Sequence, residues 1–283
     1  MEEHPLTHGG AEAIVDLITP LEQKHAVRIA SDAGIVPSED KSAWLGALGS
    51  ADYRIVDEEI NMGVIEFTTR VREPAGPFDK PIIHNILVRE CFDRLFKKIM
   101  ERLRTSLIGN PGIGKSWFQK YFIYRLLQEY RQHRETGGET TPVQAVIRHI
   151  APNLFEIYCF ESMSVWEATP RNVEQFLRYF DPERVFYLFE PNQTQDQEPR
   201  VTELCALATV SPLASRIKEF SKKSVPLYMP VWNRSEIFAA AQYLSTSVPE
   251  ELVPYYTTDQ IKKRLDQYGG IFRYVFPTSV PEI

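Results

Sequence analysis

The stretch of sequence that decides the fold reads Gly109-Asn110-Pro111-Gly112-Ile113-Gly114-Lys115-Ser116. Its spacing is that of a phosphate-binding loop, in which four residues separate two glycines, and a lysine and a hydroxyl residue follow. A β-rich run, Thr105–Ile108, precedes the loop. An amphipathic pattern, with apolar residues four positions apart, follows it from Lys115 to about His133. The loop therefore has the strand before it and the helix after it that this motif requires.

The residue types of the loop suit the binding of a nucleotide. Its glycines permit a tight, partly left-handed turn and let the backbone approach phosphate oxygens without a Cβ in the way. Backbone amides from about Gly112 to Trp117 point at a phosphate from a helix N-terminus, where the helix dipole favours anions. Lys115 reaches the β- and γ-phosphates, and the Ser116 hydroxyl is a ligand for Mg²⁺. We therefore predict that residues 109–117 bind ATP and Mg²⁺.

A carboxylate at the end of a neighbouring strand is the second requirement for ATP hydrolysis, to hold the metal's water shell or to activate water. The apolar run Val185–Phe189 ends in Glu190, which is therefore our Walker-B candidate as a catalytic residue and metal ligand. Two other interpretations stay open. Glu190 is the water-activating glutamate of a pair whose aspartate is replaced by Phe189, or it is an exposed acid at a strand end.

Two further residues are candidates for contact with the nucleotide. An apolar run, Leu207–Val210, leads into Ser211, whose hydroxyl stands where a γ-phosphate sensor is expected, although a simple turn residue fits equally well. Arg273 follows the double-glycine break Gly269-Gly270. From a helical lid it would reach the phosphates as an arginine finger does, and a surface arginine is the alternative.

Outward from the loop, apolar runs and amphipathic segments alternate. We expect strands over Val143–Ile147, Leu154–Phe160, Val185–Phe189, Leu204–Val210 and Leu227–Met229. We expect helices over Ile86–Leu103, Asn172–Phe180, Ser235–Leu244 with Ser235 as its cap, and Thr258–Tyr268 ended by Gly269-Gly270. This alternation predicts a three-layer α/β domain with a mainly parallel sheet and a helical C-terminal end.

The N-terminal quarter differs from the rest in charge. Residues 1–75 carry 14 acids and 6 bases, whereas 76–283 carry 24 acids and 26 bases. Three prolines within 72–81 predict a linker between two domains. We therefore divide the chain into an acidic N-terminal α+β module, 1–75, and a larger domain, 76–283. In the module we expect helices over Ala11–Ile18 and Leu21–Ala30, and a hairpin of Tyr53–Val56 and Val64–Phe67 with its turn at Asn61-Met62-Gly63.

The composition is that of an ordinary globular protein. Of 283 residues, 43 % are hydrophobic and 25 % charged, and the formal net charge is −6, which excludes collagen-like, disordered and disulfide-scaffold classes. The three cysteines form no CxxC pair, so we expect free thiols rather than zinc or disulfides. No apolar run approaches the ~18 residues of a membrane span and no signal-peptide pattern opens the chain, so we expect an intracellular, soluble protein without a membrane partner.

Six segments, in order, carry a family resemblance. They are Val88-Arg89-Glu90-Cys91, Gly109–Phe118, Tyr187-Leu188-Phe189-Glu190, Ser211-Pro212 with Lys218–Lys222, Met229-Pro230-Val231-Trp232 and Gly269–Val275. Together they resemble the P-loop ATPase domain shared by the Crinkler effectors and the retrotransposon-hot-spot (RHS) proteins, over about 75–276. Only the phosphate loop is specific by itself, and the order and spacing of all six make the resemblance.

The resemblance implies a P-loop NTPase core of the additional-strand type with a C-terminal helical lid. It implies phosphate and Mg²⁺ binding by Lys115 and Ser116, the Walker-B role for Glu190 and a lid role for Arg273. Proteins of this family act as effectors in host cells, often in nuclei, or as nuclear proteins. The resemblance therefore also implies a host or nuclear protein partner, which residues 1–75 would hold.

Two positions depart from the family's usual pattern, because Glu190 stands where aspartate is common and Phe272 where proline is common. The leading interpretation is a module that binds ATP with Mg²⁺ and hydrolyses it. The alternative is a nucleotide-gated protein-interaction switch with little or no hydrolysis, which the glutamate favours. A motor acting on nucleic acid is a weaker third interpretation, because a pI of about 5.6 and the lack of helicase motifs count against it.

Overall fold

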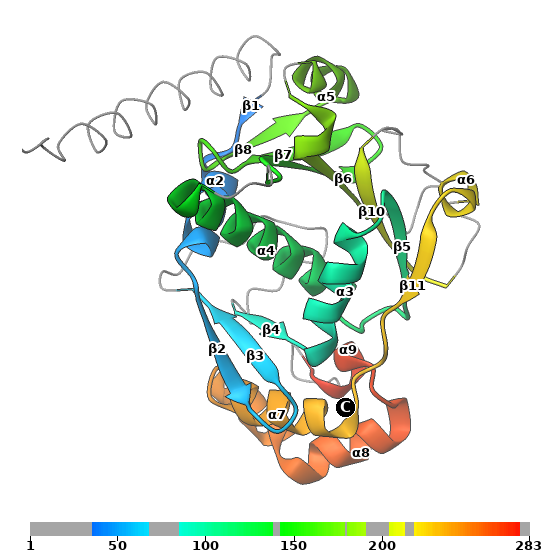
Figure 1. The fold of residues 1–283 in the computed structure, drawn as a ribbon. Helices are drawn as coiled ribbons and strands as arrows, with labels where there is room; N and C mark the ends of the chain where they lie inside the picture. Colours follow the sequence, from blue (N-terminus) through cyan, green and yellow to red (C-terminus); the bar gives the residue numbers. More distant parts are fainter. Residues whose placement is uncertain are drawn as a thin grey trace, which may run out of the picture.

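The computed structural model describes residues 36–67, 85–137, 142–178, 180–190, 204–212 and 218–277. The helices expected over 11–18 and 21–30 and the linker expected at 72–81 lie outside these residues. The described part of the chain forms an α/β structure with two separate sheets (Figure 1). One sheet has eight strands and the other has three. No helix among the described residues is long and apolar enough to cross a membrane.

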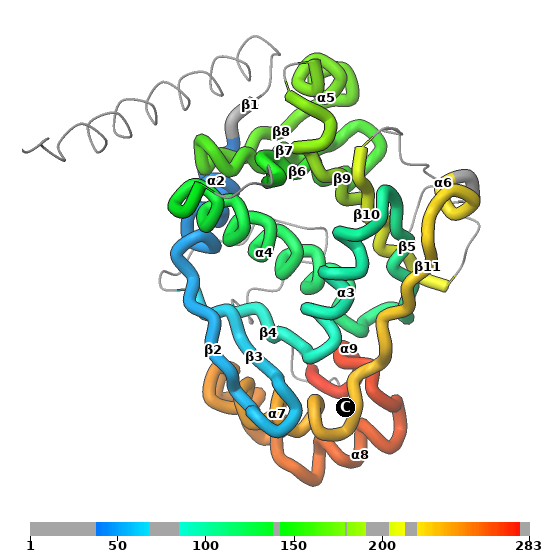
Figure 2. The backbone as a smooth tube through the Cα atoms, in the orientation of Figure 1, coloured from blue at the N-terminus to red at the C-terminus, as the bar shows by residue number. Residues whose placement is uncertain are grey.

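The large sheet has the strand order β1-β8-β7-β6-β9-β10-β5-β11. Its strands are β1 (Val36–Pro37), β5 (Arg104–Ile108), β6 (Ala145–Ala151), β7 (Leu154–Cys159), β8 (Ser164–Ala168), β9 (Val185–Phe189), β10 (Cys205–Val210) and β11 (Val225–Tyr228). Neighbouring strands from β6 through β9, β10 and β5 to β11 are parallel, and Figure 2 labels these strands along the tube. The strands expected from the sequence are confirmed, with ends that differ by a few residues.

The sheet is mixed, whereas the sequence predicted a mainly parallel one. β7, β8 and β1 pair antiparallel at one edge. The reason is the short connections, because only two residues join β6 to β7 and four join β7 to β8. Connections of this length allow antiparallel neighbours, whereas a parallel pair needs a crossover of a dozen residues or more.

Helices cover both faces of the large sheet. On one face, α2 (Glu39–Gly49), α3 (Glu90–Met100) and α4 (Lys115–Thr136) share a core with Val146, Leu188 and Leu207. On the other face, α5 (Pro170–Leu177) and α6 (Lys218–Lys222) share a core with Ile147 and Tyr187. Adjacent residues of one strand enter opposite cores because side chains alternate along a strand. This arrangement is compatible with a three-layer α/β fold.

The small sheet has the order β2-β3-β4 and packs against the C-terminal helices. The expected hairpin is confirmed as β2 (Asp52–Asp57) and β3 (Met62–Glu66), with its turn slightly earlier than expected. β4 (Ile86–Val88) corrects the expectation of a helix from Ile86, because these residues pair with β3 and α3 begins only at Glu90. Three successive buried apolar residues fit a strand with both faces covered, and they give no one-sided helical stripe.

The C-terminal helices α7 (Arg234–Ser245), α8 (Thr258–Tyr268) and α9 (Phe272–Val275) form the third core with β3 and β4. Two 3₁₀ helices, Pro182–Arg184 and Glu250–Tyr256, complete the described elements. The expected helix 258–268 and its glycine end are confirmed. Ser235 is not the cap of α7, because Asn233 and Glu236 form a reciprocal capping box that starts the helix one residue earlier.

The described part of 1–75 shares its cores with the rest of the chain. α2 packs in the same core as α3 and α4, and β3 pairs with β4 from beyond residue 85. The three cysteines are free thiols, with Cys91 and Cys159 buried and Cys205 half-buried.

Candidate functional site

The predicted phosphate loop connects β5 to the N-terminus of α4, where its backbone is left-handed at two positions. Gly112 has a φ of 81° and Gly114 a φ of 101°, values that glycine adopts without the strain a Cβ brings. Gly114 is also the N-cap of α4 and has no side chain to cap it. The first amides of α4 therefore remain available to an anion at a helix N-terminus.

Contacts from the C-terminal segment hold the loop on its outer side. The indole Nε1 of Trp232 donates to the carbonyl of Ile113 at 2.9 Å, and the amide of Arg273 donates to the carbonyl of Gly112 at 3.2 Å. A Cβ on Gly112 would lie 2.8 Å from the Cβ of Arg273. The loop and the segment after the double glycine are thus in direct backbone contact. The structure places Arg273 beside the loop through its main chain.

Trp232 is itself fixed by a buried ion pair. Arg89 lies over the indole, 4.7 Å from the ring centroid, and its Nη2 is 2.8 Å from the Glu236 carboxylate. Arg89 also donates to the carbonyls of Pro230 and Val231. Each of the three guanidinium nitrogens of Arg89 therefore has an acceptor within the protein, which fixes the guanidinium against the indole.

Lys115 folds back onto its own loop. Its Nζ donates to the carbonyls of Gly109 at 2.7 Å and Asn110 at 2.9 Å. Burial lowers the pKa of Lys115 to about 8, with a further lowering from Arg273 and an opposing contribution from Glu190. Lys115, Arg273 and Glu190 are therefore close enough to interact electrostatically at the loop.

Ser116 and Glu190 meet in the structure, although 74 positions separate them. The Ser116 hydroxyl donates to Glu190 Oε1 at 2.6 Å. Glu190 directly follows β9, and its amide donates to the carbonyl of His149 on β6. The predicted strand end therefore carries the carboxylate to the first turn of α4.

Ser211 lies at the same edge of the sheet. It directly follows β10, whose last carbonyl, that of Val210, accepts a hydrogen bond from the amide of Gly109 at 3.1 Å. Ser211 is half-buried and stands next to the residue that contacts the start of the loop. Its role as a phosphate sensor stays a prediction. Trp117, the last predicted loop residue, packs its ring against Phe272, with centroids 4.9 Å apart.

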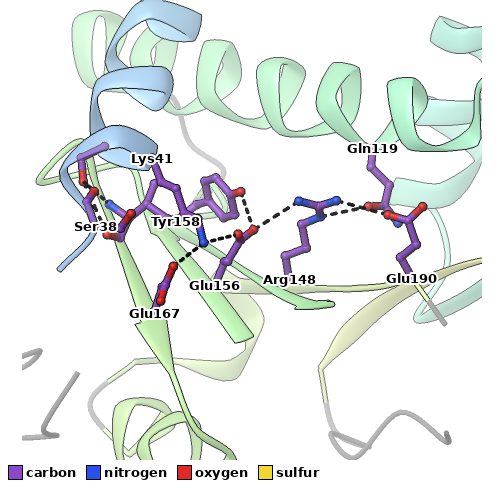
Figure 3. Close-up of polar contacts among 10 residues, drawn as sticks. Ser38, Lys41, Gln119, Arg148, Glu156, Tyr158, Glu167 and Glu190 are labelled. Atoms are coloured by element: carbon purple, nitrogen blue, oxygen red, sulfur yellow. Dashed lines mark hydrogen bonds and ion pairs between the residues drawn. The ribbon is translucent and has the colours of Figure 1, made fainter. Parts of the chain in front are cut away.

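A network of polar side chains connects to Glu190, and the sequence did not indicate it (Figure 3). Arg148 on β6 places Nη2 3.2 Å from Glu190 Oε2 and Nη1 3.2 Å from Glu156 Oε2. Its Nε donates to Gln119 Oε1 at 3.3 Å, and Gln119 in turn donates to the Thr209 hydroxyl at 2.7 Å. A basic residue after the apolar run 143–147 was the one signal available, and it does not identify these partners.

Burial and neighbouring charges have opposing effects on the pKa values of the charged groups in this network. Burial lowers the pKa of Arg148, but Tyr158, Glu156 and Glu190 together raise it above its ordinary value. Burial raises the pKa of Glu156, but Arg148 and Lys41 outweigh it and hold that pKa below its ordinary value. Both groups are therefore charged at neutral pH.

The donor set fits magnesium. Among the described residues, no group of three or more His, Cys, Asp and Glu side chains could hold a metal ion. Mg²⁺ in nucleotide sites needs no such group, because phosphates and waters supply most of its ligands beside one or two protein oxygens. The adjoining Ser116 hydroxyl and Glu190 carboxylate are oxygens of this kind.

Comparison with known proteins adds no family to this description. No protein-family model matches the chain, and no curated protein shows a significant match to it.

Proposed function

We propose that this protein binds ATP with Mg²⁺ at residues 109–117 and hydrolyses it. One observation carries the proposal: the Ser116 hydroxyl at a helix N-terminus lies 2.6 Å from the Glu190 carboxylate at the end of a neighbouring strand. The same site therefore contains a loop with left-handed glycines, a lysine, and two oxygens that suit a metal ion. These are the parts that phosphoryl transfer from ATP requires.

The strand order supports a P-loop NTPase of the additional-strand type. β10 lies between β5, which leads into the loop, and β9, which leads into Glu190. All three strands are parallel, so that the loop, Ser211 and Glu190 follow the carboxyl ends of adjacent strands. This edge is the usual place of ligands in open α/β sheets.

In the proposed site the residues of the loop and Glu190 divide the binding of nucleotide and metal between them. The loop amides and Lys115 would bind the phosphates and neutralise their charge, and Ser116 and Glu190 would hold the magnesium ion. When bound, that ion would neutralise charge on the phosphate oxygens. Glu190 also orients the attacking water. The backbone contact of Arg273 with Gly112 supports a lid position for its guanidinium, beside the phosphates.

The test is nucleotide turnover by the purified protein with Mg²⁺, beside Lys115→Ala and Glu190→Gln. We expect Lys115→Ala to lose nucleotide binding, and Glu190→Gln to keep binding while turnover falls by roughly 100-fold or more. Lys97→Ala is the matched control, because this lysine is an exposed residue of α3 and forms an ion pair with Asp93 on the same helix. A wild-type protein that binds no ATP with Mg²⁺ would overturn the proposal.

A nucleotide-gated interaction switch is the second candidate, and one observation favours it. Both oxygens of Glu190 are engaged, one by Ser116 and the other by Arg148, so this carboxylate is less available to activate water. The same assay separates the two functions. Tight ATP binding with background turnover in the wild type would identify the switch.

The resemblance to Crinkler and RHS proteins adds a proposal about context. On this proposal the chain is the ATPase module of an effector or a nuclear protein, and residues 1–75 hold a host or nuclear protein partner. A fluorescent fusion of the full chain in a host cell would test the location, because the described part of 1–75 shares its cores with the rest of the chain and cannot be removed without disrupting them. Exclusion of the fusion from the nucleus would contradict a nuclear role.

A further inference from the structure

Arg148 has three defined partners on three different elements (Figure 3). Nη2 contacts Glu190 after β9, Nη1 contacts Glu156 on β7, and Nε contacts Gln119 on α4. A guanidinium presents its donors in a rigid plane, so three partners in three directions fix both its position and its rotation. Arg148 is therefore held more firmly than a surface arginine with one acidic partner.

The inner partner of Arg148 is the better anchored of its two carboxylates. The Glu156 side chain is 1 % exposed, whereas that of Glu190 is 31 % exposed. Glu156 also accepts from the Tyr158 hydroxyl at 2.7 Å and lies 2.7 Å from Lys41 Nζ. Separating Arg148 from Glu156 would leave a buried charge short of a partner, which is costly. Glu190 is the more exposed of the two carboxylates, so it is the one that Arg148 can position.

We propose that Arg148 is a positioning residue of the ATP site, which fixes Glu190 so that Oε1 faces Ser116 while Oε2 is engaged, and that Glu156 and Lys41 set the place of Arg148. The inference rests on the proposed function, because it concerns the carboxylate assigned to magnesium. It extends the site to Lys41 on α2, whose ion pairs with Glu156 and Glu167 connect it to Arg148 through Glu156. With Arg148 in place, Glu190 offers a single oxygen to the metal.

The first arm of the test needs no nucleotide. Urea unfolding of Arg148→Met, Glu190→Gln and the double variant forms a double-mutant cycle, and Lys41→Met with Glu190→Gln forms a second. We expect non-additivity of about tenfold in the unfolding equilibrium constant for Arg148 with Glu190. For Lys41, which acts through two intermediates, we expect a smaller coupling of the same sign. Additivity in the Arg148 cycle overturns the inference whatever the protein binds.

The second arm measures the Mg²⁺ concentration that half-saturates binding of a fluorescent ATP analogue. In Arg148→Met, Glu190 is freed from one partner, and we expect this concentration to change about tenfold or more with a smaller effect on metal-free nucleotide affinity. Arg148→Lys keeps the charge but has one nitrogen for three partners, so we expect an intermediate value. A structural role alone would alter both affinities equally.

Two further variants distinguish an effect on the site from a simple loss of folding. Arg148→Met/Glu156→Gln removes the stranded inner charge, and we expect it to regain stability while it keeps the altered Mg²⁺ requirement. Glu167→Gln is the matched control, because Glu167 contacts Lys41 at 2.6 Å on the side away from Arg148. We expect a Mg²⁺ requirement within about twofold of the wild type for it.

The outcomes separate the inference from the proposed function. A wild-type protein that binds no analogue at any Mg²⁺ concentration overturns both. Binding by the wild type together with an unchanged Mg²⁺ requirement in Arg148→Met overturns the inference alone. A changed requirement in Arg148→Met and in its stabilised double variant, and none in Glu167→Gln, supports it.

Discussion

At the scale of single residues, Gly112 is the position where backbone geometry and packing coincide. Its φ of 81° and the short distance from a built Cβ to the Cβ of Arg273 both exclude a side chain. The contact is between two backbones, which cannot move apart without breaking the hydrogen bond from the Arg273 amide. The glycine is therefore required by the close approach of Arg273 as well as by the turn.

We expect Gly112→Ala to destabilise the protein by about 1–3 kcal/mol, because alanine is strained at this φ and collides with Arg273. Gly46→Ala is the matched control, since Gly46 is exposed in α2 and a Cβ there meets no atom within 4 Å. In a helix the same substitution should stabilise by roughly 0.5–1 kcal/mol. Thermal and urea unfolding measure both, and equal effects of the same sign would contradict this explanation.

Among the buried carboxylates, Glu156 is expected to contribute to stability against acid. Its pKa is held below its ordinary value by Arg148 and Lys41 against the effect of burial. In the folded protein it binds a proton less readily than in the unfolded chain, so its contribution is present above the ordinary value of 4.5. That contribution is lost as the pH falls through the lower folded pKa.

We therefore expect Lys41→Met to move the acid-unfolding midpoint to higher pH, because the pKa of Glu156 then rises towards its ordinary value. Circular dichroism between about pH 7 and pH 2 measures the midpoint. Glu167→Gln is the control, since Glu167 is the more exposed partner of Lys41 and should shift the midpoint less. An equal shift in both variants would show that Lys41 does not act through Glu156.

At the scale of elements, the Arg89–Glu236 pair joins the N-cap of α3 to α7. Both side chains are buried, 1 % and 5 % exposed. Removing only one partner leaves an uncompensated charge, so we expect Arg89→Met to cost about 3–5 kcal/mol of stability. We expect Arg89→Met/Glu236→Gln to recover most of this loss, because glutamine keeps the capping box with Asn233. Urea unfolding tests the pair, and a double variant as unstable as the single one would contradict it.

Elements with strong local signals were predictable from the sequence. β9 and α8 have the predicted bounds, because an apolar run with polar ends and a helix ended by glycine are decided locally. α2 was missed because two glycines among eleven residues weaken its helical propensity. β8 was missed because it is a short strand whose formation depends on pairing with β7 and β1.

The candidate site also has a part that the sequence predicts and a part that it does not. The loop, Ser116 and Glu190 follow from residue types and from the carboxyl ends of parallel strands, a rule that holds for any such sheet. Arg148, Gln119 and Thr209 come from β6, α4 and β10, and their contacts exist only after those elements pack. No spacing in the sequence encodes such a meeting. The same is true of Trp232 and the Ile113 carbonyl.

At the scale of the whole molecule, the loop lies where two of the three cores meet. Ile113 belongs to the core of α2, α3 and α4, whereas Trp232 and Phe272 belong to the core of the small sheet and the C-terminal helices. A ligand at the loop would therefore bind to residues that are packed into both of these cores. We expect binding to stabilise both against unfolding together.

We expect ATP with Mg²⁺ at about 100 times its Kd to raise stability by about 2.7 kcal/mol. Differential scanning calorimetry should show one unfolding transition that moves to higher temperature as a whole. Lys115→Ala should show no such shift. Two transitions, of which only one responds to the ligand, would contradict the coupling of the two cores.

Two of the four tryptophans of the chain, Trp232 and Trp44, lie near opposite ends of the site. Trp232 bonds the loop carbonyl of Ile113, whereas Trp44 lies edge-on against Tyr158 with ring centroids 6.1 Å apart, and the Tyr158 hydroxyl donates to Glu156. Each indole is thus a built-in fluorophore for a different region. Two variants that each keep one of these indoles, with the other three tryptophans replaced by phenylalanine, would give separate fluorescence signals. One signal would report on the loop and the other on the surroundings of Glu156.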